Sequence, residues 1–335
     1  MDRTSTAEKG GAAFDGVTLL LCENPLPPLE AAVDAARDEL PRSNHYTEAH
    51  SAPLREVIAD RVGVPTANVH VNAGSELILR QLFDRFGQRV HLLTPTYPLF
   101  PEIADEYTET RLRPADDFRF DLGDLAVPDD ATLAVVVNPN NPNGTGFEMD
   151  ALPDLLEANP GTRFLVDEAF VDFVDESVAH LVPAYDNLLV TRTLSKAHSL
   201  AGFRVGYAIL PAPIADDLDA SNDAYPLARP SQAAAIATLE HEAAIRDRVE
   251  RLRSWTDDLA AELRSLGVRT FPTETYFFLA DFSPRDAGAV AAQLRERQIF
   301  VKPLDDDRLG DGYVRMTTAR PEDNERVVAA LSEIL

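Results

Sequence analysis

Short apolar runs bounded by turn-forming residues alternate along this chain with longer segments of helical periodicity. The runs predict six β-strands, at residues 69–72, 90–93, 133–138, 164–167, 188–191 and 204–210. This alternation is typical of a mostly parallel sheet covered by helices. Four of the runs end in a polar residue: Asn72, Asn138, Asp167 and Thr191. Open α/β sheets bind ligands just past the carboxyl ends of their strands, so one functional edge is expected there.

The pattern changes after about Ala233. A long helical stretch to Leu266 is followed by the apolar run 276–281, a helical stretch over 286–297, short strands near Phe300 and Val314, and a last helix over 322–335. This order predicts a smaller α+β domain. The N-terminal segment through about Pro41 is expected to pack against it. The predicted division is thus a large domain at 42–233 and a small domain made of 1–41 plus 234–335.

Composition and charge narrow the possible partners. The chain has 335 residues, 45% of them hydrophobic, a net charge of −25 and an isoelectric point near 4.5. Nucleic acids and anionic membranes both need a cationic face, so neither is an expected partner. The absence of a long apolar stretch and of a signal-peptide core predicts a cytoplasmic protein. The acidic, lysine-poor composition suggests a halophilic source. Cys22 is the sole cysteine, so neither an internal disulfide nor a Cys-cluster metal site is expected.

The segment TRTLSKAHSLAGFRVGY at 191–207 carries the first candidate chemistry. Only three lysines occur among the 31 basic residues, and Lys196 follows a hydroxyl residue, Ser195, by one position and precedes Arg204 by eight. A lysine amine condenses with aldehydes, and pyridoxal phosphate is the commonest aldehyde that proteins hold in this way. Ser195 and Arg204 are suitable donors to its phosphate. A solvated surface lysine is the alternative interpretation.

A second phosphate-binding element is predicted between the strand 69–72 and the helical segment 76–86. Gly74 and Ser75 lie at this junction, where the backbone N–H groups that open a helix attract anions. A plain N-cap explains Ser75 equally well.

Two strand ends offer groups for the cofactor's ring. Asp167 ends the run RFLVD, and a carboxylate against the pyridine nitrogen keeps that nitrogen protonated. Asn141 lies in the turn NPNNPNGT at 138–145, and its amide can donate to the ring oxygen. Strand-end capping by Asp167, and a simple turn around Asn141, are the alternatives.

Tyr97 and Arg315 complete the candidate site. Tyr97, in LTPTYPLF, follows a buried-strand pattern and could stack on a flat cofactor, although a lone tyrosine is more often filler. Arg315, in GYVRMT, is a charge on an apolar strand, and a buried arginine needs an anion. A substrate carboxylate bound through both nitrogens of the guanidinium fits this need, and a structural ion pair is the alternative.

Taken together, these motifs resemble the fold type I pyridoxal-phosphate enzymes, in the histidinol-phosphate aminotransferase branch of the class I/II aminotransferases. The resemblance covers almost the whole chain and rests on motifs in the family's order: ENP at 23–25, HY at 45–46, GSE at 74–76, PTY at 95–97, NPNNPNGT, VDEAF, RTLSKAHSLAGFRVGY and VRMTTARPEDN. It implies the α/β fold of those enzymes, with a mostly parallel sheet in the large domain and a smaller α+β domain.

The resemblance also implies roles for individual residues. Lys196 would bind the cofactor covalently and shuttle protons, Asp167 would pair with the ring nitrogen, and Arg315 would bind the substrate carboxylate. The phosphate would be held by Gly74, Ser75, Ser195 and Arg204, the ring oxygen by Asn141 and the ring face by Tyr97. Tyr46 would reach the phosphate of a neighbouring subunit, which implies a homodimer with shared active sites. No metal is implied.

Three positions depart from the family pattern. Phe170 stands where the family usually has a tyrosine that donates to the ring oxygen, which leaves Asn141 that role alone. Lys302 stands where the histidinol-phosphate enzymes tend to have an arginine for the substrate's phosphate. The positive charge is therefore kept, but the planar guanidinium that can bind a phosphate through two nitrogens is not. Tyr276 occupies the place of a common asparagine.

Three functions are compatible with these motifs. The leading one is a transaminase that acts on histidinol phosphate or a related amine or amino acid, with 2-oxoglutarate as the amino acceptor. A phosphothreonine-type decarboxylase would use the same Lys, Asp and Arg set. A cofactor-binding regulatory domain without turnover is the third, and the chain lacks the basic helix expected of a DNA-binding partner domain.

Overall fold

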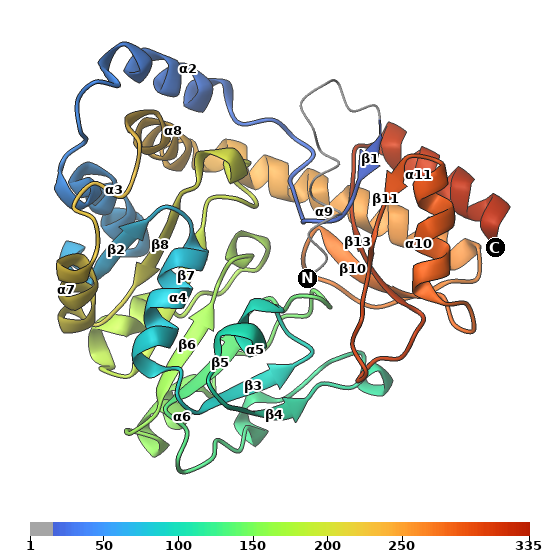
Figure 1. The fold of residues 1–335 in the computed structure, drawn as a ribbon, viewed down its shortest axis with the longest axis horizontal. Coiled ribbons are helices and arrows are strands. Elements are labelled where there is room, and N and C mark those ends of the chain that lie inside the picture. The colour runs from blue at the N-terminus through green and yellow to red at the C-terminus, as the bar shows by residue number, and fades with distance from the viewer. Residues whose placement is uncertain (1–15) are drawn as a thin grey trace.

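The computed structural model describes residues 16–335, so Lys9 and the rest of the first 15 residues lie outside the described part of the chain. The described chain forms two lobes joined by one long helix (Figure 1). The large lobe is built on a seven-stranded sheet with the order β2 (Val69–Asn72), β8 (Gly206–Ile209), β7 (Leu188–Thr193), β6 (Arg163–Asp167), β5 (Leu133–Val137), β3 (Val90–Thr94) and β4 (Tyr107–Arg111). Neighbours from β7 to β4 are parallel, whereas β8 is antiparallel to both β7 and β2.

Both faces of this sheet are covered by helices, which explains the uninterrupted apolar strands. In β5, Ala134 and Val136 join one hydrophobic cluster, while Leu133, Val135 and Val137 join another on the opposite face. The covering helices are α3 (Ala52–Val62), α4 (Ser75–Phe86), α5 (Leu99–Ile103), α6 (Leu152–Ala158), α7 (Ala212–Ser221) and α8 (Arg229–Leu239). Strands buried on both sides lose the polar alternation of an exposed sheet.

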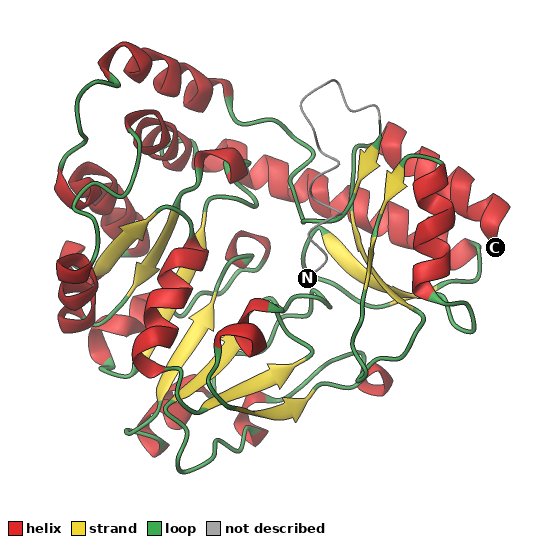
Figure 2. Cartoon of the chain, viewed as in Figure 1, coloured by secondary structure: helices red, strands yellow, loops and turns green. Residues whose placement is uncertain are grey.

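The small lobe contains an antiparallel sheet backed by helices (Figure 2). The sheet has the order β12 (Lys302–Pro303), β13 (Tyr313–Thr317), β10 (Phe277–Asp281) and β9 (Arg269–Thr270), and a separate parallel pair joins β1 (Val17–Thr18) to β11 (Ile299–Phe300). The helices are α9 (Glu242–Ser265), α10 (Ala287–Glu296) and α11 (Pro321–Ile334). The predicted fold class, α/β with a smaller α+β part, is confirmed.

The structure differs from the sequence-based expectations in three places. The edge strand β4 was not predicted, and the helical pattern expected to run unbroken to Leu266 is interrupted at Glu240 and His241, between α8 and α9. The N-terminal segment contributes to both lobes: Val17 lies in the small-lobe core, but α2 (Glu30–Glu39) packs on α8 and places Ala32 in the cluster of the large sheet. The domain boundaries at residues 42 and 233 stay a prediction.

The described residues also bear on membranes and metals. Among residues 16–335, no helix is long and apolar enough to cross a membrane. Within the same range, no group of three or more His, Cys, Asp and Glu side chains is placed to hold a metal ion.

Candidate active site

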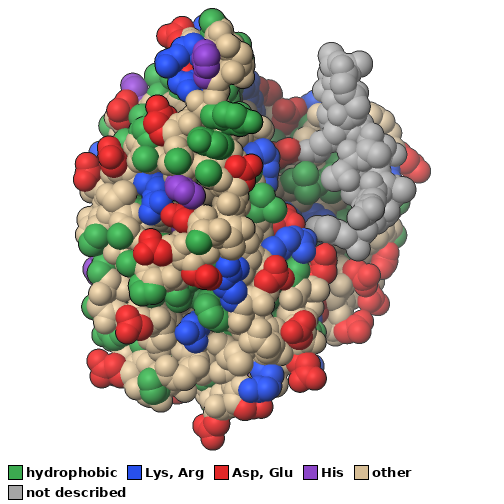
Figure 3. All heavy atoms as spheres, turned by 60° about the vertical axis from the view of Figure 1, so that its left-hand side comes forward, with side chains coloured by type: hydrophobic (Ala, Val, Ile, Leu, Met, Phe, Trp, Pro, Cys, Tyr) green, Lys and Arg blue, Asp and Glu red, His purple; other side chains and the backbone are tan. Residues whose placement is uncertain are grey.

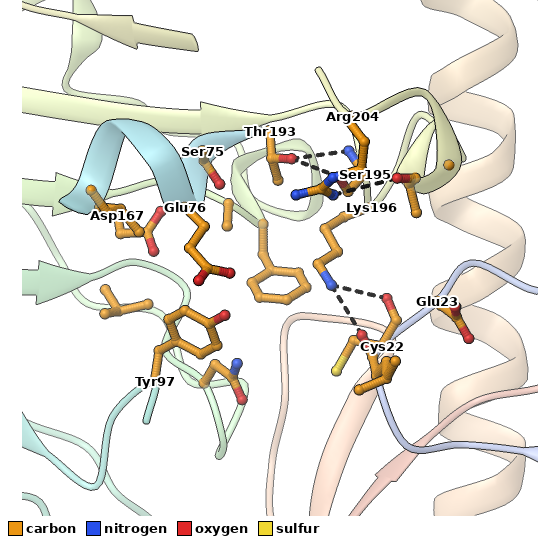
Figure 4. A pocket seen from close by; sticks show the side chains of 18 residues that line it. Cys22, Glu23, Ser75, Glu76, Tyr97, Asp167, Thr193, Ser195, Lys196 and Arg204 are labelled. Atoms are coloured by element: carbon orange, nitrogen blue, oxygen red, sulfur yellow. Dashed lines mark hydrogen bonds between the residues drawn. The ribbon is translucent and has the colours of Figure 1, made fainter. Parts of the chain in front are cut away.

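A cavity of about 380 Å³ opens where the carboxyl ends of β5, β6 and β7 face the small lobe. Seven residues predicted from the sequence line it: Ser75, Tyr97, Asn141, Asp167, Ser195, Lys196 and Arg204. Figure 4 shows Asp167 and Lys196 reaching this space from different segments of the large lobe. The parallel strands end at one edge of the sheet, and residues distant in sequence therefore meet there.

Lys196 lies three residues beyond the end of β7, and its half-buried side chain crosses the cavity toward the N-terminal segment. Its Nζ donates to the carbonyl oxygens of Leu21 at 3.1 Å and Cys22 at 3.2 Å, and it stands 5.6 Å from the centre of the Phe170 ring. Burial lowers the pKa of the Lys196 amine. A lowered pKa increases the fraction of neutral amine, which is the nucleophilic form.

Asp167, the last residue of β6, is 4% exposed and faces the same cavity. Burial raises the pKa of its carboxyl to about 6, against the lowering effect of the hydrogen bond from Thr191 Oγ1, 3.2 Å from Oδ1. The neighbouring Glu168 is also buried, but it is held by Arg192, whose Nε donates to it at 2.8 Å. Asp167 therefore carries the carboxylate that is available to a ligand in the cavity.

The start of α4 and the segment from Ser195 to Gly206 form a close cradle. Gly74 has a φ of +94°, and a Cβ atom there would lie 2.5 Å from a terminal nitrogen of Arg204. A Cβ on Gly206 would lie 2.0 Å from the Ser75 backbone nitrogen. Among the described residues, no side-chain hydrogen bond caps the start of α4. Glycines thus allow a strand, a helix start and a guanidinium to approach closely enough to hold a phosphate.

Hydroxyl groups complete this cradle. Thr193 Oγ1 donates to Ser195 Oγ at 2.9 Å and accepts from the Ser195 backbone N–H at 3.1 Å. Thr193 lines the cavity as well. The helix N-terminus, the Arg204 guanidinium and these hydroxyls are the donor set that pyridoxal phosphate requires, so the residues present fit the cofactor.

Tyr97 and Asn141 also line the cavity, and Asn141 is hydrogen-bonded to Arg315. Burial, followed by the nearby charge of Glu76, raises the pKa of the Tyr97 phenol to about 12, so this hydroxyl stays protonated. Arg315 is 8% exposed and donates to Asn141 Oδ1 at 2.9 Å and to the carbonyl of Leu20. Its buried Nε has no hydrogen-bond partner among the described residues. An arginine with an unused buried donor is suited to a carboxylate.

Two predicted residues lie away from this cavity. Lys302 lies opposite Arg315 in the register of the antiparallel strands β12 and β13. It lines a separate cavity of about 290 Å³ with Leu20 and Arg295. Tyr46 is 78% exposed on the surface, where its ring stacks on Tyr225 with 4.6 Å between centroids.

Sequence reasoning missed the N-terminal segment 20–24 as part of the site. Its carbonyls bind Lys196 and Arg315, and the Asn24 side chain donates to the backbone oxygens of Lys196 at 3.0 Å and Ala197 at 3.2 Å. The hydroxyl of Tyr276 donates to the Cys22 carbonyl. The ENP motif was the only sequence feature that indicated this segment, because backbone carbonyl acceptors do not depend on residue type.

Comparison with known proteins agrees with this geometry. Residues 17–331 match the family "Aminotransferase class I and II". Histidinol-phosphate aminotransferase 1 of Bordetella parapertussis is 35% identical over 333 residues, which cover 96% of this chain and 92% of that relative. Two solved structures share the fold at 23% identity. Histidinol-phosphate aminotransferase from Sinorhizobium meliloti, in complex with pyridoxal-5'-phosphate, has a TM-score of 0.87 over 95% of this chain and 90% of that one. L-threonine-O-3-phosphate decarboxylase from Porphyromonas gingivalis has a TM-score of 0.85 over 95% and 99%.

The fold and the lysine-centred cavity define an α/β enzyme of the aminotransferase type. The chain belongs to the class I and II aminotransferase family. This membership confirms the family, the enzyme class and the pyridoxal phosphate dependence predicted from the sequence.

Proposed function

We propose that this enzyme transfers an amino group between histidinol phosphate, or a related amine or amino acid, and 2-oxoglutarate. The main support is one cavity lined by a half-buried lysine, a buried carboxylate and Arg204, with the buried Arg315 hydrogen-bonded to Asn141 of the lining. The Arg204 guanidinium would bind the cofactor's phosphate, and the Arg315 guanidinium would bind a carboxylate of the substrate. The names of the relatives that cover most of the chain favour histidinol phosphate as the amine.

Each of the cavity's side chains has a proposed task. Bound pyridoxal phosphate supplies an aldehyde and a ring that withdraws electrons from the substrate's α-carbon. Lys196 Nζ would hold the cofactor covalently and would carry the proton. The Asp167 carboxylate would keep a proton on the ring nitrogen. Binding and orientation are assigned to the remaining predicted residues: Gly74, Ser75, Tyr97, Asn141, Ser195 and Arg204 toward the cofactor, and Arg315 and Lys302 toward the substrate.

Assembly, location and domain division belong to the same proposal. The exposed Tyr46 ring is available to a second copy of the chain, which supports a homodimer with shared sites. The predicted location is the cytoplasm, where histidine biosynthesis would place the enzyme. The proposed large cofactor-binding domain spans 42–233 and the proposed small domain comprises 1–41 plus 234–335, with α2 contacting α8 across these boundaries.

The function is tested by half-reactions followed through the cofactor's absorbance. Histidinol phosphate and glutamate should each convert the bound cofactor to its amine form, and 2-oxoglutarate should restore the starting spectrum. Carbon dioxide release from phosphothreonine would instead identify a decarboxylase, which shares the fold. Spectra unchanged by any amino donor would point to a regulatory protein without turnover.

Arg204→Gln should weaken cofactor binding. Loss of a hydrogen-bonded positive charge from the phosphate cradle should raise the Kd for pyridoxal phosphate about 10- to 100-fold, since such bonds contribute about 1.5–3 kcal/mol. Spectrophotometric titration of cofactor-free protein measures this. Arg326→Gln, which removes the same charge from the outer side of α11, is the matched control and should leave the Kd unchanged. Equal affinities for wild type and Arg204→Gln would remove Arg204 from the site.

The acidic surface supports the proposal of a halophilic enzyme. On the face shown in Figure 3, acidic side chains are spread across the surface with basic side chains interspersed among them, and the whole chain carries a net charge of −25. Salt screens this repulsion, with a Debye length that falls from about 10 Å at 0.1 M to about 3 Å at 1 M. The melting temperature should therefore rise by at least about 5 °C from low to multimolar KCl. Full stability and activity without added salt would contradict the proposal.

A further inference from the structure

The ion pair between Glu109 and Arg308 joins the two lobes, as does the pair between Arg269 and Asp117. Glu109 belongs to the edge strand β4 of the large lobe, and Arg308 belongs to the small-lobe loop 304–312 that leads into β13. Arg308 Nε lies 2.8 Å from Glu109 Oε2. In Figure 1 this loop extends from the small lobe down to β4. Both side chains are mostly buried, with exposed fractions of 24% and 19%, so water and salt screen the pair less than a surface pair.

On the large-lobe side, Glu109 also holds the segment that carries Tyr97. Thr94 Oγ1 donates to the same Oε2 atom at 3.0 Å. Thr94 is the last residue of β3, three positions before Tyr97, which lines the active-site cavity. Burial opposes ionisation of Glu109, but hydrogen bonds from Arg111, Arg308 and Thr94 hold its pKa below the ordinary value. The carboxylate is therefore charged at neutral pH.

On the small-lobe side, Arg308 fixes the loop that leads to Arg315. Its Nη1 donates to both oxygens of Asp306, at 3.0 and 3.2 Å, and the Asp306 carboxylate accepts the Arg308 backbone N–H. The Arg308 guanidinium thus binds Asp306 within the loop and Glu109 of the large lobe at the same time. Seven residues after Arg308 the chain reaches Arg315 in β13, which is hydrogen-bonded to Asn141 at the cavity wall.

We propose that Glu109 and Arg308 are positioning residues that hold the large-lobe segment carrying Tyr97 and the small-lobe strand carrying Arg315 at a fixed separation. Neither residue lines the cavity. They act through Thr94 on one side and through the loop 304–312 on the other. This inference rests on the proposed function only where it concerns turnover, because the coupling between these two segments is a property of the cofactor-free chain.

The test uses Arg308→Gln in the full-length, cofactor-free protein, followed by hydrogen exchange. Loss of the charge should speed exchange about 5-fold in loop 304–312 and also in residues 94–101, because a partly buried ion pair contributes about 1 kcal/mol. The matched control is Arg111→Gln. Arg111 donates to the other oxygen of Glu109 at 2.6 Å but belongs to the same strand, so its loss removes an equal charge without breaking the link between lobes. The control should leave both segments unchanged.

A second variant and a double variant make the result decisive. Glu109→Gln should reproduce the exchange pattern of Arg308→Gln, and the double variant should be no faster than either single one. In the loaded enzyme, Arg308→Gln should raise the KM for the amino donor about 5-fold with kcat changed less than about 2-fold. Faster exchange confined to loop 304–312, additive effects in the double variant, or equal effects of Arg111→Gln would overturn the proposal. Because exchange is read without cofactor or substrate, a failed transaminase assay leaves this outcome intact.

Discussion

Replacing Lys196 with alanine should reduce turnover by at least about 10⁴-fold, because one side chain both binds the cofactor covalently and moves the proton. The Lys196 amine is the only one of the two described lysine amines that lines the cavity, and burial keeps its pKa low. The lysine side chain packs against Phe170 and carbonyl oxygens without entering a strand, so the fold should persist. Single-turnover kinetics with glutamate measures the loss, and thermal unfolding checks the fold.

Lys302→Ala is the matched control for this experiment, since it removes the other described lysine from a separate cavity. It should keep the covalent cofactor and change mainly the KM for a phosphorylated amine. Borohydride reduction of loaded wild type followed by peptide mapping should place the cofactor's mass on the peptide with Lys196. Label on Lys9 or Lys302, or turnover retained in Lys196→Ala, would refute the assignment.

The sheet was largely predictable, for a reason visible in its packing. Strands such as β5 and β6 are covered on both faces, and their continuous apolar runs therefore stand out. The strand β4 has the sequence YTETR at the sheet edge and is mostly exposed, so its composition resembles a loop. The break between α8 and α9 falls at Glu240 and His241, where neither proline nor glycine marks an end.

The site residues at strand ends were predictable because the carboxyl ends of parallel strands lie at the same edge of the sheet. Asp167 and Thr191 are paired in register on β6 and β7, and the sequence places both at strand ends. The contacts that Lys196 and Arg315 make with residues 20–22 could not be predicted, because those acceptors are backbone carbonyls that any sequence supplies. The position of Lys302 depends on how the short strand β12 pairs with β13, and two residues carry no periodicity.

The second large effect is expected for Asp167→Asn, which keeps the shape of the side chain and removes its charge. Without a carboxylate the ring nitrogen would lose its proton, and turnover should fall about 10²–10³-fold, the usual cost of removing one preorganised electrostatic contact. The amide oxygen can still accept the Thr191 hydroxyl bond. Half-reaction rates with glutamate measure the effect, with Asp186→Asn, an exposed acid before β7, as the control.

The same substitution should stabilise the cofactor-free protein in a pH-dependent way. Burial raises the pKa of Asp167 from 3.8 to about 6, so the folded state holds this proton more tightly than the unfolded state. Stability from this group is present below the unfolded pKa and is lost as the pH rises through about 6, at a cost of about 3 kcal/mol above that pH. Asp167→Asn removes the cost, and urea unfolding should therefore show a gain of up to about 3 kcal/mol near pH 8 that shrinks near pH 4.5. An equal gain in the free energy of unfolding at both pH values would show that burial of the Asp167 charge does not cause the gain. A loss of activity together with a gain of stability would identify Asp167 as a charge that is retained for the cofactor.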